Sequence, residues 1–428
     1  MFLVPALTVP APAYAAFTAP HRVSPRSESV VALDQATDRQ GDTTFFYSGS
    51  DGFDIRVRKA DGTLRPPVQV VDRTRVALSS LHAVAVDRDG DGIAVWDEED
   101  DLLPHARLFA RRFSRTGHLG PVVRISQHTP VDQSVIGVHA AVQPGGRAVV
   151  TWNLQAGAGY RPYLRLVGLG SGRSHIKQVG PGPNADAPLV LMKPTGGALL
   201  LWNNDAIMAR HLGARGHLFP IHRLRGERYP GEQPTVEEAA FDRHGVAVIA
   251  AHRAARITGP AGTDYRGQAC IARVSPRLRL IGKLRAVSPH RRDIAAGTVR
   301  VGVAPGGQAI VSWLYDHPFD AADGTYARSV SPSGSLGRPR RLSYGDGGDI
   351  ALTRDGDGVV TSTGVPRDQF GTPVRIFVTR VHNGRLGRTL KVAHGTFQTH
   401  YLTASVRRTG RALVSFVGDG DLLTVSGR

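Results

Sequence analysis

The sequence repeats one pattern of short apolar segments and turns along almost its whole length, and residues 299–343 show that pattern most completely. Residues 299–303 alternate in polarity as in a half-buried β-strand, and residues 309–313 form a continuous apolar run that suits a central strand. A third strand is predicted at 325–330 and a short, charged edge strand at 340–343. Four antiparallel strands cannot bury both faces of their sheet alone. A chain that repeats such a unit must therefore stack its units.

The repeat also predicts the architecture. First strands are expected to begin near residues 30, 82, 139, 189, 236, 299, 350 and 402. Four-stranded units of this length, stacked radially, make a β-propeller. We therefore predict an all-β protein, a β-propeller with eight blades of four antiparallel strands, with seven blades as the alternative.

The two ends of the chain predict how the ring closes. The last unit stops after three strands, and an isolated strand-like segment at 21–24 precedes the first unit. We expect this N-terminal strand to pair with the C-terminal blade, because closure removes the exposed edges of an open array. Residues 16–428 then form a single domain. An apolar stretch followed by the small-x-small pattern Ala13-Tyr14-Ala15 predicts that residues 1–15 are the remainder of a signal peptide, and hence a secreted, extracytoplasmic protein.

Composition limits the partners. The chain has 53 Lys and Arg against 36 Asp and Glu, a net charge of +17, which favours anionic partners. The basic residues are scattered instead of grouped with aromatic residues, so nucleic acid is a poor candidate and an envelope or extracellular glycan or protein is expected. No apolar run is long enough to span a membrane as a helix, and we expect a monomer. The single cysteine, Cys270, lies in a strand pattern and is expected to be a small buried residue.

Two recurrent features have both a functional and a structural interpretation. The alternating carboxylates of Asp87, Asp89 and Asp91 resemble a calcium loop, and calcium is the only cofactor that the sequence suggests. The equivalent turns of four other units, at 142–147, 192–197, 303–308 and 406–411, contain no acid, so a hairpin turn that needs Gly, Asn or Asp is the alternative. Four tryptophans also recur at one point of the repeat, where packing between blades is preferred over a ligand cage: Trp96, Trp152, Trp202 and Trp313.

The loops after the second strands vary between units, and in a propeller these loops open together on one face, at the mouth of the channel. A mouth rich in carboxylates on a basic protein suits a cation, a sugar or a basic peptide. The alternative is a solvated surface that aids solubility. The predicted ligand-binding residues are Asp97, Glu98, Glu99, Asp100, Asp101, Asp264, Tyr265, Asp316, His317, Asp320 and Asp323.

The sequence contains no G-x-S-x-G, H-E-x-x-H or Walker motif, so it names no catalytic residue. The patterns GG-x-A-[VIL]-[VL]-x-W and [FV]-S-x-x-G-x-L-G recur over residues 21–428, and in them the chain resembles secreted bacterial β-propeller repeat proteins. This resemblance implies an architecture and no specific enzyme. We predict an extracytoplasmic binding or interaction module of unknown ligand. The alternative is a carbohydrate-active enzyme, a glycoside hydrolase or polysaccharide lyase, with an acid and base from the mouth carboxylates and His317.

Overall fold

The fold is seen in a computed structural model, which describes most of residues 17–427. The segments outside the described residues are 1–16, 26–29, 31–32, 50–51, 73–79, 101–102, 128–133, 144–145, 157–158, 169–174, 183–184, 187, 194–195, 225–231, 260–261, 290–294, 317–323, 346, 354, 365–373, 396–401, 408, 419–420 and 428. Side chains are also not described for residues 99–100, 103–106, 156, 232–233, 254–259, 262–266, 295–298, 316 and 394–395, which lie at the ends of strands.

The described residues form eight four-stranded antiparallel sheets and no helix. We number the sheets as blades 1 to 8 and give the strands of each from the centre of the ring outward. Blade 1 contains β2 (Leu33–Thr37), β3 (Thr43–Gly49), β4 (Gly52–Arg58) and β5 (Val68–Asp72), and blade 2 contains β6 (Leu81–Val86), β7 (Gly92–Asp100), β8 (Leu103–Phe113) and β9 (Leu119–Arg124). Blade 3 contains β10 (Val135–Val142), β11 (Ala148–Ala156), β12 (Gly159–Val167) and β13 (Lys177–Gln178), and blade 4 contains β14 (Leu189–Met192), β15 (Ala198–Asn203), β16 (Ile207–Leu212) and β17 (Leu218–Arg223).

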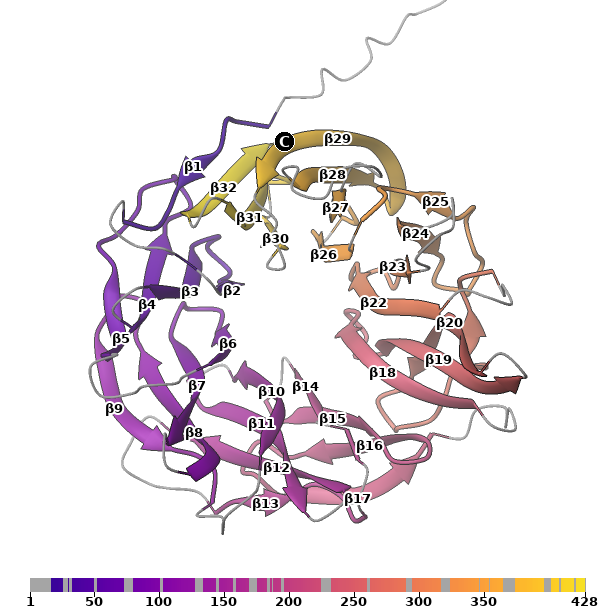
Figure 1. The fold of residues 1–428 in the computed structure, drawn as a ribbon, viewed down its shortest axis with the longest axis horizontal. Helices are drawn as coiled ribbons and strands as arrows, with labels where there is room; N and C mark the ends of the chain where they lie inside the picture. The colour runs from indigo at the N-terminus through magenta and orange to yellow at the C-terminus, as the bar shows by residue number, and fades with distance from the viewer. Residues whose placement is uncertain are drawn as a thin grey trace, which may run out of the picture.

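Blade 5 contains β18 (Glu232–Phe241), β19 (Ala247–Gly259), β20 (Gly262–Val274) and β21 (Arg285–Ala286), and blade 6 contains β22 (Ala295–Val303), β23 (Ala309–Asp316), β24 (Gly324–Val330) and β25 (Arg340–Arg341). Blade 7 contains β26 (Gly347–Leu352), β27 (Gly358–Gly364), β28 (Val374–His382) and β29 (Arg385–Gly395), and blade 8 contains β30 (Leu402–Val406), β31 (Ala412–Gly418), β32 (Asp421–Gly427) and β1 (His21–Arg22). The blades surround one axis, with the first strand of each at the centre (Figure 1). The prediction of an eight-bladed all-β propeller is confirmed.

The N-terminal strand closes the ring as predicted. Strand β1 pairs antiparallel with β32, and the backbone N–H of Val23 donates to the carbonyl of Leu422 at 2.6 Å. Arg22 adds an ion pair with Asp421 at 2.5 Å, and the Val23 side chain is fully buried. Blade 8 therefore takes three strands from one end of the chain and the fourth from the other.

The hydrophobic core is divided into eight clusters, one at each interface between neighbouring blades. The four recurrent tryptophans lie in these clusters and are fully or almost fully buried, so the packing interpretation is confirmed. Trp313, for example, stacks on Tyr326, the residue opposite it on β24, with ring centroids 6.0 Å apart. Cys270 is buried in the same way, in the cluster between blades 4 and 5. Recurrence of a large side chain in register follows from this stacking of like blades.

Arginine completes the interfaces at the outer side of the ring. Five blades carry an arginine at the same point of the third strand, and its guanidinium donates to a backbone carbonyl near the outer strand of the preceding blade. Arg111 shows the arrangement: Nη1 donates to the Val70 carbonyl of blade 1 at 2.8 Å, and Nε to the Gly120 carbonyl of its own blade at 2.9 Å. The five arginines are Arg56, Arg111, Arg165, Arg210 and Arg328. Part of the basic composition is therefore structural, because a guanidinium can serve two carbonyls at once.

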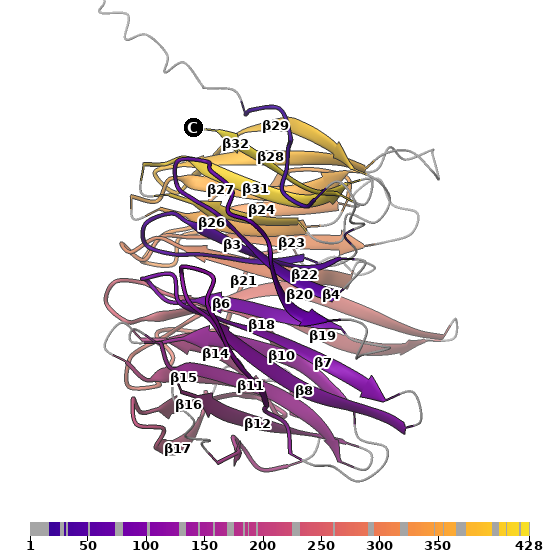
Figure 2. The ribbon, with the colours of Figure 1, turned by 90° about the vertical axis from the view of Figure 1, so that its left-hand side faces the viewer.

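No helix that could cross a membrane occurs among the described residues. Seen from the side, the ring is a disc, and the long hairpin of β19 and β20 projects from one face (Figure 2). The sequence predicted an insertion at 252–268. The structure shows that most of this insertion extends the two strands of a regular hairpin instead of forming a loop.

Candidate functional site

The innermost strands surround the axis of the ring, yet most of their residues are only half-buried, because the ring encloses a solvent-accessible channel. Each inner strand ends in a hairpin turn of the same geometry, in which a glycine N–H donates to the carbonyl three residues earlier. The residue four positions before the start of that turn therefore lies at one level of the channel in every blade. From blade 1 to blade 8 these residues are Asp34, Ala83, His139, Leu189, Glu238, Arg300, Asp349 and Thr403.

Three of these residues are acids that bridge to the next blade. Asp34 accepts the N–H of Val84 at 2.6 Å, and Glu238 accepts the N–H of Val301 at 2.6 Å. Asp349 accepts the N–H of Ala404 at 3.1 Å. The innermost strand of a blade has no neighbouring strand on its channel side, so its backbone N–H groups need another acceptor. The acids supply this acceptor.

The three acids differ in how many of their carboxylate oxygens accept a backbone N–H. Asp34 also accepts the N–H of Gln35 at 2.8 Å, and Asp349 also accepts that of Ile350 at 2.7 Å, each with its second oxygen. Glu238 accepts a single backbone N–H, from Val301, through Oε2. Among the described residues, none donates a hydrogen bond to the other oxygen of Glu238. That oxygen is therefore not used by the described part of the fold.

The position of these acids makes them harder to ionise. Burial raises the pKa of Asp34 to about 6, and burial together with the charge of Asp349 raises the pKa of Glu238 to about 7. Burial also raises the pKa of Asp349 and of Glu237, while Arg300 opposes both increases. Desolvation penalises the charged form of a carboxyl group, so Glu238 in particular exchanges its proton near neutral pH.

Glu237 and Arg300 add unbridged charges to the channel. The pairing of β18 with β19 shifts between Val236 and Glu238, and this β-bulge places Glu237 next to Glu238 on the inner strand. Arg300, on the next inner strand, attracts Glu237, Glu238 and Asp349 electrostatically. Within the described part of the chain it forms no ion pair or side-chain hydrogen bond with any of them. The acids and the guanidinium are therefore close enough to interact electrostatically but are not in direct contact.

His139 stands at the same level in blade 3. Burial, followed by the charge of Arg300, lowers its pKa to about 4, so the imidazole is neutral at neutral pH. A neutral imidazole both donates and accepts hydrogen bonds. This inner ring of charged residues was not predicted from the sequence. Its signal is a single position of the repeat. Across the eight units this position holds Asp, Ala, His, Leu, Glu, Arg, Asp and Thr, whereas the position after it is apolar in every unit but the first.

The acidic run of blade 2 begins on a strand, whereas the sequence placed it in a loop. Strand β7 continues to Asp100, and Asp97 is buried. One Asp97 oxygen accepts the N–H of Ser80 at 2.6 Å and the other lies 3.1 Å from Nε2 of His82. Glu98 accepts the indole N–H of Trp96 at 3.0 Å. These two carboxylates therefore hold the end of the blade together. The side chains of Glu99 and Asp100 are not described, and Asp101 lies outside the described residues.

The remaining mouth residues are only partly placed. Asp264 and Tyr265 lie on β20 near the tip of the long hairpin, and Asp316 is the last residue of β23, with no description of these side chains. His317, Asp320 and Asp323 lie outside the described residues. Their assignment to a ligand site stays a prediction.

The calcium-like turn uses its carboxylates for the backbone. Oδ1 of Asp87 accepts the N–H groups of Asp89 at 2.9 Å and Asp91 at 3.1 Å, and Asp91 accepts the N–H of Arg115 at 3.0 Å. Asp89 is exposed and lies 3.4 Å from Nε of Arg88. Among the described residues there is no group of three His, Cys, Asp or Glu side chains arranged to hold a metal ion. The hairpin interpretation accounts for each of these contacts.

Comparisons with known proteins bear on the fold. No protein-family model matches the chain, and no curated protein matches it in sequence. Similar solved structures include the WD40 domain of SCAP from fission yeast, with a TM-score of 0.53 and 9% identity over 96% of this chain and 98% of that chain. Another is the polysaccharide lyase Uly1, with a TM-score of 0.50 and 10% identity over 81% of this chain and 89% of that one. At such low identity these similarities show the propeller architecture alone.

Proposed function

We propose that this propeller is an extracytoplasmic binding module that holds a carbohydrate, or another ligand rich in hydroxyl groups, in its channel. The observation that carries the proposal is the arrangement of Arg300 opposite Glu237 and Glu238, with one oxygen of Glu238 not used by the fold. A hydroxyl group can accept a hydrogen bond from a guanidinium and donate one to a carboxylate. A ligand with only one sign of charge would satisfy only half of this site. The apolar stretch and small residues before residue 16 support the location outside the cytoplasm.

The proposal can be tested with the full chain and a panel of neutral oligosaccharides, by calorimetry at pH 7. Replacing Arg300 by Met and Glu237 by Gln should each weaken binding about tenfold or more, since each removes a charge-assisted hydrogen bond. Arg243→Met, at an exposed hairpin turn, is the matched control and should bind as the wild type does. Equal binding by all four proteins would place the ligand outside the channel and refute the proposal.

A second candidate function is a carbohydrate-active enzyme, and one observation favours it: a carboxyl group whose pKa is raised to about 7 beside a channel is suited to act as a general acid. If Glu238 has this role, Glu238→Gln should lower the release of reducing ends or unsaturated products from a polysaccharide by roughly 10²–10⁴-fold. Activity that persists in this variant would exclude Glu238 as the acid. The similarity to a polysaccharide lyase concerns the fold and adds no residue to this argument.

A further inference from the structure

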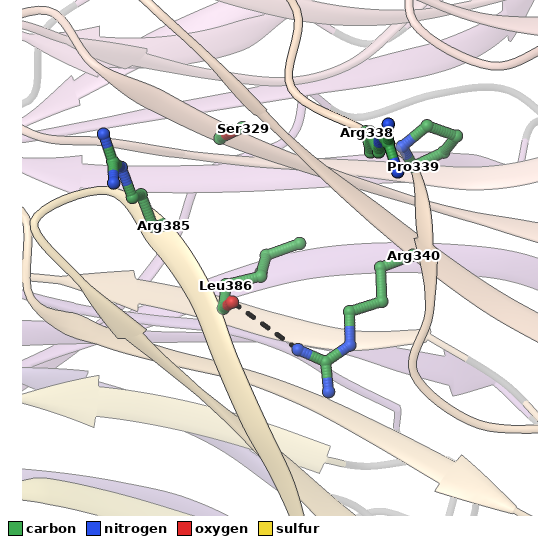
Figure 3. Close-up of a pocket in the computed structure, with 6 residues that line it drawn as sticks. All are labelled: Ser329, Arg338, Pro339, Arg340, Arg385 and Leu386. Carbon is green, nitrogen blue, oxygen red and sulfur yellow. Dashed lines mark hydrogen bonds between the residues drawn. The ribbon is translucent and has the colours of Figure 1, made fainter.

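A second polar site lies far from the axis, on the outer surface between blades 6 and 7. It is a pocket with a volume of ≈ 370 Å³, and Figure 3 shows the residues that line it. Arg338, Pro339 and Arg340 come from the segment around β25, and Arg385 and Leu386 begin β29 of the next blade. Ser329, on β24, completes the lining.

The pocket is formed by close packing that the sequence enforces. The N–H of Gly337 donates to the Ser329 carbonyl at 2.9 Å, and a Cβ atom on Gly337 would lie 2.3 Å from Oγ of Ser329. Only glycine lets the outer segment approach β24 so closely. Across the pocket, Nη1 of Arg340 donates to the Leu386 carbonyl at 3.5 Å and also to that of Gly387, which fixes this side chain between the blades.

The guanidinium groups at the pocket are not neutralised by the fold. The side chains of Arg338 and Arg385 form no hydrogen bond or ion pair with another described residue, and in the described contacts of Arg340 its Nε and Nη2 are not used. None of the lining residues is an acid. Three cationic side chains around one pocket create a strongly positive potential.

The pocket belongs to a wider basic surface, which we term the basic belt. It consists of the outer segments of blades 4 to 7, residues 213–224, 275–289, 331–345 and 383–395, which follow the outside of the ring (Figure 1). These segments contain no Asp or Glu, and nearly all of their Arg and Lys residues are exposed. This part of the outer surface is therefore uniformly basic, whereas the inner ring contains three acids at the level of Arg300.

We propose that the basic belt binds an acidic polysaccharide, with the pocket between blades 6 and 7 as the primary site for one of its sulfate or carboxylate groups. Guanidinium groups match the planar oxygen pairs of such anions. A polymer with repeated charges can continue along the belt on either side of the pocket. This site is separate from the channel and does not depend on the function proposed for it.

The shape and lining of the belt favour a polysaccharide over nucleic acid. Duplex DNA is stiff, with a persistence length of about 50 nm, and follows the outside of so small a ring only at a high bending cost. Single strands are held mainly by aromatic stacking, and the pocket lining contains no aromatic residue. The exposed Tyr344 nearby has its ring face covered by the Arg341 guanidinium, 4.0 Å from the ring centroid.

The test compares binding of heparin, alginate, neutral dextran and single-stranded and duplex DNA to the full chain at a fixed salt concentration. The variant Arg338→Ser with Arg385→Ser and Arg340→Ser should bind heparin or alginate at least about tenfold more weakly. The matched control removes three exposed charges outside the belt, by Arg39→Ser, Arg88→Ser and Arg243→Ser, and should lose about threefold at most, through the general field.

Because Arg340 also joins the blades, a double variant with only Arg338→Ser and Arg385→Ser keeps that contact and should melt as the wild type does while still losing affinity. Whichever acidic polysaccharide binds more tightly identifies the anionic group. An equal loss of affinity in the belt and control variants, or tighter binding of either DNA than of both acidic polysaccharides, would overturn the assignment.

Discussion

Single residues of the inner strands determine both the stability of the ring and the chemistry of its channel. Asp34, Glu238 and Asp349 occupy equivalent positions, yet the shorter Asp side chain reaches back to the N–H of the following residue, and the longer Glu does not. The two aspartates are therefore committed to the backbone through both oxygens, while Glu238 is committed through one. Side chains at equivalent positions of a repeat can thus have different roles, some structural and some available for ligand binding.

This difference predicts opposite outcomes for two similar substitutions. Asp349→Asn should lower the free energy of unfolding by about 1–3 kcal/mol, because the new amide must turn its NH₂ group toward one of two backbone N–H groups. Glu238→Gln should not lower it at pH 7, since the amide oxygen can accept from Val301 while the NH₂ group takes the place of the second carboxylate oxygen. Urea unfolding of both variants measures this. Equal costs would show that the free oxygen of Glu238 has a partner in the fold.

The raised pKa of Glu238 predicts how stability depends on pH. Its ordinary pKa is 4.5 and its pKa in the fold is about 7, so the unfolded chain releases this proton first as the pH rises. The stabilising contribution is full below about pH 4.5 and is lost as the pH rises to about 7. Unfolding of the wild type and of Glu238→Gln from pH 4 to 8 should show a shallower decline for the variant. Asp355→Asn, at an exposed turn, should follow the wild type.

The arginines between blades provide a further prediction at the residue scale. Arg111→Lys should cost about 1–2 kcal/mol, because an ammonium group cannot reach the carbonyls of Val70 and Gly120 together. Arg388→Lys, on the exposed belt, is the control and should lie within about 0.5 kcal/mol of the wild type. Thermal unfolding distinguishes them. If Arg111→Lys does not change stability, then burial of the aliphatic part of the side chain, and not the paired hydrogen bonds, stabilises the interface.

At the scale of whole elements, the closing strand β1 contributes more to the stability of the ring than its two residues suggest. A chain that begins at residue 28 loses the pairing of β1 with β32, the Thr18 and Val23 backbone bonds and the buried Val23 side chain. We expect a loss of at least about 3 kcal/mol, from hydrogen bonds of about 1 kcal/mol each and an apolar side chain worth about 1.5–3 kcal/mol. A chain that begins at residue 17 should melt as the full chain does. Equal melting of both truncations would mean that the ring closes without β1.

Elements were well predicted where the repeat is regular and less well where a blade departs from it. Apolar periodicity and recurrent turns predicted the strands around Trp152 and Trp313, because packing against like neighbours leaves a regular pattern. The insertion of blade 5 was not predicted as a long hairpin, since Arg253, Arg256 and Asp264 give it the composition of a loop. Backbone pairing continues along both strands to Gly259 and Gly262, and pairing leaves little trace in residue type.

On the scale of the whole molecule, three acids line the channel at the level of Arg300, and the outer segments of blades 4 to 7 carry only basic charges. The sequence predicted the net charge and the acidic mouth, but not this division, because it arises only when eight strands meet at one axis. Glu238 and Asp349 are far apart in sequence and interact only in the closed ring. The repeat position that both residues occupy looks like an ordinary strand position in each unit, and its charged character is seen only when the eight units are aligned.

The channel as ligand site is the central claim, and a crystal structure of the complex with the tightest-binding neutral oligosaccharide tests it most directly. We expect electron density for the ligand at the level of residue 300, with its oxygens within about 2.7–3.2 Å of the Arg300 guanidinium and of a carboxylate of Glu237 or Glu238. A ligand bound only on the outer surface or at the loop tips, with Arg300 and these two acids contacting solvent alone, would contradict the account.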